Sequence, residues 1–138
     1  METIIIALVF LWLGFVGAIS FMESWLKFRV KELTLPIGLK VGQKVFGALN
    51  KVEIFISLVL ICIALFYLPN ISTATYILLA VAMSFVLIQT FLLLPMLDKR
   101  VAILLKGEKP KKSMLHMYYV TSEMAKVACL VIVGIKLI

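Results

Sequence analysis

Uninterrupted apolar runs dominate the hydrophobic pattern of this chain, in place of the amphipathic periodicities of soluble helices and strands. Residues Thr3 to Met22 carry no charge, and no charged residue occurs from Ile54 to Leu97. The second run is broken only by the turn-forming stretch 69–73, with Pro69 and Asn70 at its start. A membrane-spanning helix needs about 20 predominantly apolar residues. These runs therefore predict three spanning helices, with a tight turn between the second and the third.

A fourth apolar segment at the C-terminus is too short to span by itself. Only nine uncharged residues separate Lys126 from Lys136. A spanning helix there must begin further upstream and draw Glu123, Tyr119 and His116 into the membrane or its inner interface. Ionisable groups at membrane depth are costly and mark functional sites by default.

The second predicted helix must also include polar residues, because its apolar run from Ile54 to Leu68 is too short to span the membrane by itself. Its helix must start upstream and carry Asn50, Lys51 and Glu53 with it. We predict helices over about 3–28, 37–68, 74–97 and 114–138, in a single transmembrane domain spanning residues 1–138. Residues 101–105 are expected to form a short amphipathic turn along the inner interface.

Composition agrees with an all-α, integral membrane four-helix bundle. Hydrophobic residues make up 64% of the chain and the mean hydropathy is +1.16, whereas soluble domains are close to half apolar. The first segment lacks the basic start and the cleavage site of a signal peptide.

Charge predicts the orientation, because basic residues in short loops stay on the cytoplasmic side. The turn at 69–73 carries no charge, whereas the other two connections are rich in lysine and arginine and account for most of the net charge of +7. Both termini should therefore lie on the non-cytoplasmic side of a multi-pass protein, which we expect in a bacterial inner membrane. Basic juxtamembrane segments attract anionic lipid headgroups, so we expect membrane lipids as partners and no nucleic acid. These basic residues are Lys27, Arg29, Lys31, Lys40, Lys44, Lys99, Arg100, Lys106, Lys109, Lys111 and Lys112.

Polar residues gather in the predicted cytoplasmic half. In the fourth helix, His116, Tyr119, Glu123 and Lys126 follow one another at intervals of three, four and three residues, which places them on one helix face. We predict a polar cluster inside the bundle that faces the cytoplasm and binds a cation or a small ligand. Its members are Glu23, Asn50, Glu53, Asp98, His116, Tyr119, Glu123 and Lys126.

Two interpretations of this cluster stay open. Glu53, His116 and Glu123 are candidate ligands for a divalent metal, because mixed oxygen and nitrogen sets bind such ions. A di-iron carboxylate site is excluded, since it needs paired Glu-x-x-His motifs and the chain has one histidine. Alternatively the charges are structural pairs, as buried charges usually are. Those pairs would be Glu123 with Lys126, Glu53 with Lys51, Glu23 with Lys27, and Asp98 with Arg100.

Three functions fit these observations. The leading hypothesis is a ligand-binding or cation-binding membrane protein with a transport-related or sensing role. The first alternative is an accessory subunit of a larger membrane complex, because the chain is small and contains no phosphate loop, Cys-x-x-Cys or His-Glu-x-x-His motif. A homo-oligomer is a separate expectation, since four helices enclose little polar volume. The second alternative is a membrane enzyme that uses Glu53, Glu123 or His116 as a general acid or base on a lipid or quinone-like substrate. Such an enzyme should have an elongated apolar groove that reaches the polar cluster from the bilayer.

The segment Gly38–Phe46 and several positions around it resemble a small four-helix membrane family of unknown biochemistry, whose animal member is associated with platinum-drug resistance. The resemblance implies the four-helix topology. Glu23, Glu53 and Glu123 have no counterpart in that family, so the resemblance implies nothing about chemistry. The other matching positions are Gly17, Trp25, Phe28, Leu94–Asp98 and His116.

Overall fold

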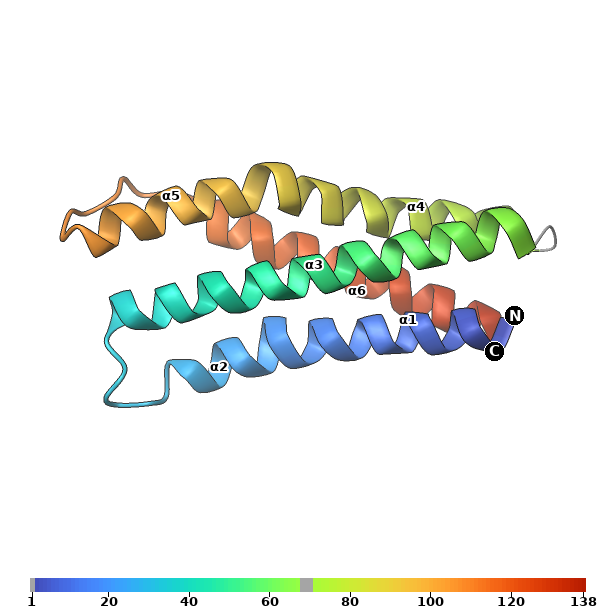
Figure 1. Ribbon diagram of the computed structural model, residues 1–138, viewed down its shortest axis with the longest axis horizontal. Helices are drawn as coiled ribbons and strands as arrows, with labels where there is room; N and C mark the ends of the chain where they lie inside the picture. The colour runs from blue at the N-terminus through green and yellow to red at the C-terminus, as the bar shows by residue number, and fades with distance from the viewer. Residues whose placement is uncertain (1, 68–70) are drawn as a thin grey trace.

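A computed structural model describes residues 2–67 and 71–138 as four antiparallel helical rods (Figure 1). The prediction of an all-helical bundle with four helices is confirmed. The first rod comprises α1 (Glu2–Val16), η1 (Gly17–Glu23) and α2 (Ser24–Lys27), and the second is α3 (Leu35–Tyr67). The third comprises α4 (Thr73–Ile88), η2 (Gln89–Leu93) and α5 (Leu94–Leu105), and the fourth is α6 (Leu115–Leu137).

Both termini lie at one end of the bundle, and the connections 28–34 and 106–114 lie at the other (Figure 1). We call these the termini end and the loop end. Three rods are long and apolar enough to cross a membrane, over Glu2–Lys27, Leu35–Phe66 and Thr73–Leu105. The rod α6 is not among them. Its charged residues Glu123 and Lys126 lie near its middle, as the sequence led us to expect.

The third rod is longer than predicted. The sequence analysis ended this helix at residue 97 and expected a separate amphipathic turn over 101–105, but α5 continues without a break to Leu105. Pro95 lies just after the π stretch η2 and does not interrupt the rod. The side chain of Val101 is buried, so α5 gains apolar packing beyond the predicted end. The predicted end of the second helix at Leu68, and the turn residues Pro69 and Asn70, lie outside the described residues.

Two stretches of π-helix interrupt the first and third rods, η1 and η2. A π turn is wider than an α turn, shifts the side chains that follow it, and occurs often at functional sites. Ser20 of η1 and Gln89 of η2 both donate hydrogen bonds to Glu123 of α6. The two π stretches therefore lie at the same level of the bundle, on two sides of one carboxylate.

The apolar core fills the termini end. Its residues recur every three or four positions on each rod, the spacing of one helix face. The outer surface is apolar as well, for example at Phe55, Phe91 and Ile135, which are 67%, 71% and 68% exposed. A bundle that is apolar both inside and outside is suited to a lipid environment. The buried core comprises Ile5, Val9, Trp12, Val16, Ile56, Leu60, Leu79, Ala82, Val86, Leu130 and Val133.

Gly134 makes the contact between α6 and α1 sensitive to side-chain size. A Cβ atom at Gly134 would lie 3.1 Å from Cζ of Phe10, whereas one at Gly14 would have no neighbour within 4 Å. We expect Gly134→Val to lower the free energy of unfolding by about 1 kcal/mol, because the half-exposed ring of Phe10 must shift to admit the larger side chain. The matched variant Gly14→Val should change it much less. Circular dichroism melts of the two purified variants in detergent check this, and equal midpoints would contradict the packing described here.

Candidate functional site

The ammonium group of Lys126 is the centre of a buried polar cluster. The side chain is fully buried, and Nζ contacts three acceptor oxygens. Oε1 of Glu123 and Oε1 of Gln89 each lie 2.8 Å away, and Oε1 of Glu53 pairs with the same nitrogen. Because an ammonium has three N–H donors, every one of them is used.

The acceptors of Lys126 come from different rods. Glu53 belongs to α3, Gln89 to η2, and Glu123 lies three residues before Lys126 on the same face of α6. The first rod joins through Trp12, whose indole Nε1–H donates to Oε1 of Glu53 at 2.8 Å. One network of hydrogen bonds and ion pairs therefore ties all four rods together.

Gln89 bridges the cation and the second carboxylate. Its amide oxygen accepts from Lys126, and its Nε2 donates to Glu123 and, at 2.8 Å, to Oγ of Ser122. Ser20 of η1 donates to Oε2 of Glu123 at 2.9 Å. Both oxygens of Glu123 are thus hydrogen-bonded, and Gln89 uses both ends of its amide.

The two carboxyl groups differ in how their oxygens are used. Oε1 of Glu53 accepts from both Trp12 and Lys126, whereas its Oε2 is buried and has no hydrogen-bond partner among the described residues. With both carboxyl groups ionised, the cluster would hold two negative charges against the single positive charge of Lys126.

A half-open cavity of about 1000 Å³ lies between the cluster and the loop end. Its size is at the upper limit of the roughly 300–1,000 Å³ that small-molecule pockets occupy. Its walls come from η1, α2, α3, α5 and α6, and most of the lining surface is apolar, including Phe21, Phe46 and Leu97. Glu123 belongs both to this wall and to the buried cluster. The other polar residues that line the cavity are Ser20, Ser24, Lys27, Gln43, Asp98, His116 and Tyr119.

Lys27 brings a positive charge to the side of the cavity. Its Nζ lies 3.5 Å from Oε1 of Glu23 and 5.8 Å from the ring centroid of Phe46. Gly42 leaves room for this ammonium, because a Cβ there would meet Nζ of Lys27. Cation–π contact and the ion pair together hold the side chain against the wall.

The structure divides the residues that the sequence singled out into two groups. Glu53, Glu123 and Lys126 meet in the buried cluster. Tyr119 lies one turn from Glu123, with its ring edge-on to Phe46 at 5.3 Å between centroids. It lines the cavity together with His116, Asp98 and Glu123.

The remaining predicted residues lie outside both features. Glu23 pairs with Lys27, and Oδ1 of Asn50 accepts a hydrogen bond from Thr90 at 3.0 Å. Lys51 is exposed, so the cation that neutralises Glu53 is Lys126 and not Lys51.

Sequence reasoning left Trp12, Gln89 and Ser20 out of the site. Gln89 had a usable signal, because it is a strongly polar residue inside an uncharged run. Trp12 and Ser20 had none, since both residue types are ordinary in membrane helices.

The three candidate metal ligands do not form a shared site. Within residues 2–67 and 71–138, no three histidine, cysteine, aspartate or glutamate side chains are grouped so that they could hold a metal ion. His116 is exposed and lies seven residues from Glu123 along α6, and Lys126 occupies the position between Glu53 and Glu123.

No family model, curated protein or solved structure matches this chain. The geometry of the cluster and the cavity is therefore the basis of the proposed function.

Removing the ammonium of Lys126 alone should destabilise the protein more than neutralising all three charged side chains of the cluster. Lys126→Met leaves two buried carboxyl groups without a cation, and breaking a buried pair in this way costs about 3–5 kcal/mol. The triple variant Glu53→Gln/Lys126→Met/Glu123→Gln leaves no buried charge and should be more stable than Lys126→Met alone. Unfolding in a titration of denaturing detergent measures both. Lys136→Met, an exposed position on the same helix, is the control and should behave as wild type. A triple variant less stable than Lys126→Met would contradict this account of the cluster.

Proposed function

We propose that the chain is a multi-pass membrane protein that binds a small, mostly apolar molecule in the cavity at the loop end, with a transport-related or sensing role. The observation that carries the proposal is the double position of Glu123, which lines an apolar cavity and contacts the buried Lys126. Ligand sites typically combine apolar walls with a few placed polar groups. A ligand in this cavity touches the cluster that ties the four rods together.

In this proposal α6 crosses the membrane with the other three rods. It packs against α1 and α4, with Glu123 and Lys126 turned inward. Its outward residues include Met124, Val131 and Ile135, which are exposed and apolar. Ionisable residues in spanning helices normally face the interior of the bundle and pair there. The charges that lower the hydropathy of α6 are therefore compatible with a membrane location.

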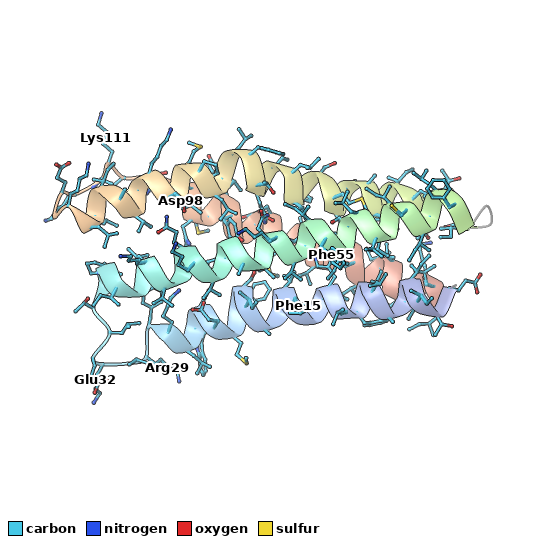
Figure 2. All side chains as sticks on the ribbon, viewed as in Figure 1. Phe15, Arg29, Glu32, Phe55, Asp98 and Lys111 are labelled. Atoms are coloured by element: carbon cyan, nitrogen blue, oxygen red, sulfur yellow. The ribbon has the colours of Figure 1, made fainter. Side chains whose placement is uncertain are left out.

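The distribution of charge supports an orientation with both termini on the non-cytoplasmic side. Arg29, Glu32 and Lys111 lie at the loop end (Figure 2). The connections that carry most of the lysine and arginine residues are both at this end. The positive-inside rule then assigns the loop end, and with it the cavity, to the cytoplasmic side.

This orientation predicts which end reacts with an impermeant reagent. In a Cys62→Ala/Cys129→Ala background, a membrane-impermeant maleimide should label Ile138→Cys in intact spheroplasts. The same reagent should label Lys109→Cys only after the membrane is permeabilised. Both positions are exposed, so reactivity reports the side of the membrane. The reverse labelling pattern would contradict the proposed orientation.

The lining of the cavity indicates the class of ligand. Its apolar surface favours a hydrocarbon or aromatic body, and Glu123, Ser20 and Tyr119 offer hydrogen-bonding groups at one side. Lipid-like and quinone-like molecules have this combination of an apolar body and a polar group.

A neutral long-chain alcohol that carries a diazirine is a direct probe of the cavity. Photolabelling of the purified protein should saturate and should be competed by excess unmodified alcohol, with labelled peptides from α5 and the first half of α6. Val120→Phe places a larger side chain on the cavity wall and should reduce the saturable labelling at least fivefold. Val131→Phe, on the same helix and outside the cavity, should not change it. Labelling that does not saturate, or that both variants affect equally, would contradict a binding cavity.

A membrane enzyme acting on a lipid or quinone-like substrate is the second candidate. The observation that favours it is that Glu123 lines the apolar cavity, which brings a carboxyl group against a space suited to an apolar substrate. The labelling experiment separates the two functions when the bound molecules are extracted and analysed. An enzyme returns chemically altered molecules and loses this conversion in Glu123→Gln, whereas a binding protein returns them unchanged.

A further inference from the structure

With Glu53 and Glu123 both ionised, the buried cluster that they form with Lys126 would carry a net charge of −1. Glu53 and Glu123 both contact the ammonium of Lys126, and each of the three side chains is at most 1% exposed. A net charge in an apolar interior is strongly unfavourable. The cluster therefore needs one further proton or one further cation to be neutral.

The hydrogen bonds indicate where the proton lies in the structure as described. A neutral carboxyl group has one carbonyl oxygen that only accepts and one hydroxyl that donates, whereas a carboxylate accepts at both oxygens. Oε1 of Glu53 accepts from Lys126 and Trp12, and its Oε2 accepts from no donor among the described residues. Oε1 of Glu123 accepts from Lys126 and Gln89, and Oε2 accepts from Ser20. Oε2 of Glu53 also donates to no acceptor among the described residues, so a proton there would displace no existing hydrogen bond, whereas both oxygens of Glu123 already accept. This asymmetry favours Glu53 over Glu123 as the site of the extra proton.

From this geometry we propose that the ligand of the cavity is a lipophilic monocation, and that it exchanges with a proton held by Glu53 and Glu123. The inference rests on the proposed function, because it names the ligand of that same cavity. The cationic group sits at Glu123, the member of the carboxyl pair that lines the cavity. The apolar body of the ligand lies against the aromatic and aliphatic wall.

Lys126 connects the two events. When a cation neutralises Glu123, the ammonium of Lys126 is free to neutralise Glu53, and the proton on Glu53 is no longer needed. One O–H bond of Glu53 breaks, one proton passes to the solvent, and one monocation enters the cavity. The total charge of the cluster and its ligand stays the same, and no other covalent bond changes.

Other charged groups around the cavity do not remove this deficit. Lys27 at the wall is already paired with Glu23, and Asp98 adds a further negative charge to the lining. The cavity and the cluster together thus hold more carboxyl groups than ammonium groups. Lys40, Lys44 and Lys99 on the flanking helices are exposed, and solvent and salt screen them. The titratable groups that face the cavity and the cluster are Lys27 of α2, Glu53 of α3, Asp98 of α5, and His116, Tyr119, Glu123 and Lys126 of α6. Glu23 of η1 lies outside the cavity as the partner of Lys27.

Three probes of related shape and different charge test the proposal on the purified full-length protein. They are tetraphenylphosphonium, tetraphenylborate and triphenylphosphine oxide. Isothermal titration calorimetry in phosphate and in Tris buffer gives both the affinity and the number of protons released. The expected result is at least tenfold tighter binding of the phosphonium than of the other two, with about one proton released per bound cation.

Substitutions assign these effects to the two carboxyl groups. Glu53→Gln mimics the protonated carboxyl group permanently, so phosphonium binding should weaken at least tenfold and release no proton. Glu123→Gln should abolish the preference for the cation. Glu108→Gln, at an exposed residue of the loop 106–114, is the control and should match the wild type in affinity and proton count.

Each contrary outcome is decisive. The inference is overturned by any of three results: equal affinity for the three probes, phosphonium binding without proton release, or no binding of any probe. All three can be measured on the wild-type protein alone, so the test does not depend on whether Glu53→Gln folds. The proposed function is tested separately by the neutral alcohol probe. Saturable labelling by the alcohol without preference for the cation would keep the binding cavity and refute the exchange.

Discussion

The ion pairs of Lys126 are the interaction on which the rest of this bundle depends. An ammonium in an apolar interior is tolerated only when its donors are satisfied, and here the acceptors come from α3, η2 and α6 itself. In lipid, apolar side chains gain little from packing against each other rather than against acyl chains. Polar contacts therefore largely determine how the rods are rotated against one another. Lys126 fixes the rotation of α6, and Trp12 extends the same network to α1.

The cluster divides the bundle into two unlike halves. On the termini side, residues such as Val9, Ala82 and Leu130 are fully buried in a packed apolar core. On the loop side, a small cluster around Leu93 and Tyr119 adjoins a cavity of about 1000 Å³. The π stretches η1 and η2 lie at this boundary and bring Ser20 and Gln89 to Glu123. The layer of polar side chains around Lys126 therefore lies between the apolar core and the cavity.

The sequence predicted the helices well because apolar run length is a local property. It also predicted that Glu123 and Lys126 share a face, since their spacing along one helix settles this. The predicted partner of Glu53, Lys51, was wrong. The choice between Lys51 and Lys126 depends on how α3 and α6 are rotated against each other, which the sequence does not show. The cavity could not be predicted, since apolar residues that line a space do not differ in type from those that fill one. The third helix was predicted too short, because the charges at 98–100 suggested an interface where the helix continues to Leu105.

In the proposed function, the position of Glu123 couples ligand binding to the packing of the helices. This carboxylate supplies one of the three acceptors of Lys126, so any group that engages it from the cavity changes how strongly α6 holds that ammonium. The ammonium then shifts its interaction toward Glu53 on α3. A ligand can move a conformational equilibrium only by binding two states differently, and the two partners of Lys126 define two such states. In the proposed exchange, a cation at Glu123 shifts Lys126 from contact with both carboxyl groups toward the pair with Glu53 on α3. The same side chains that stabilise the fold can in this way report or transmit the occupancy of the cavity.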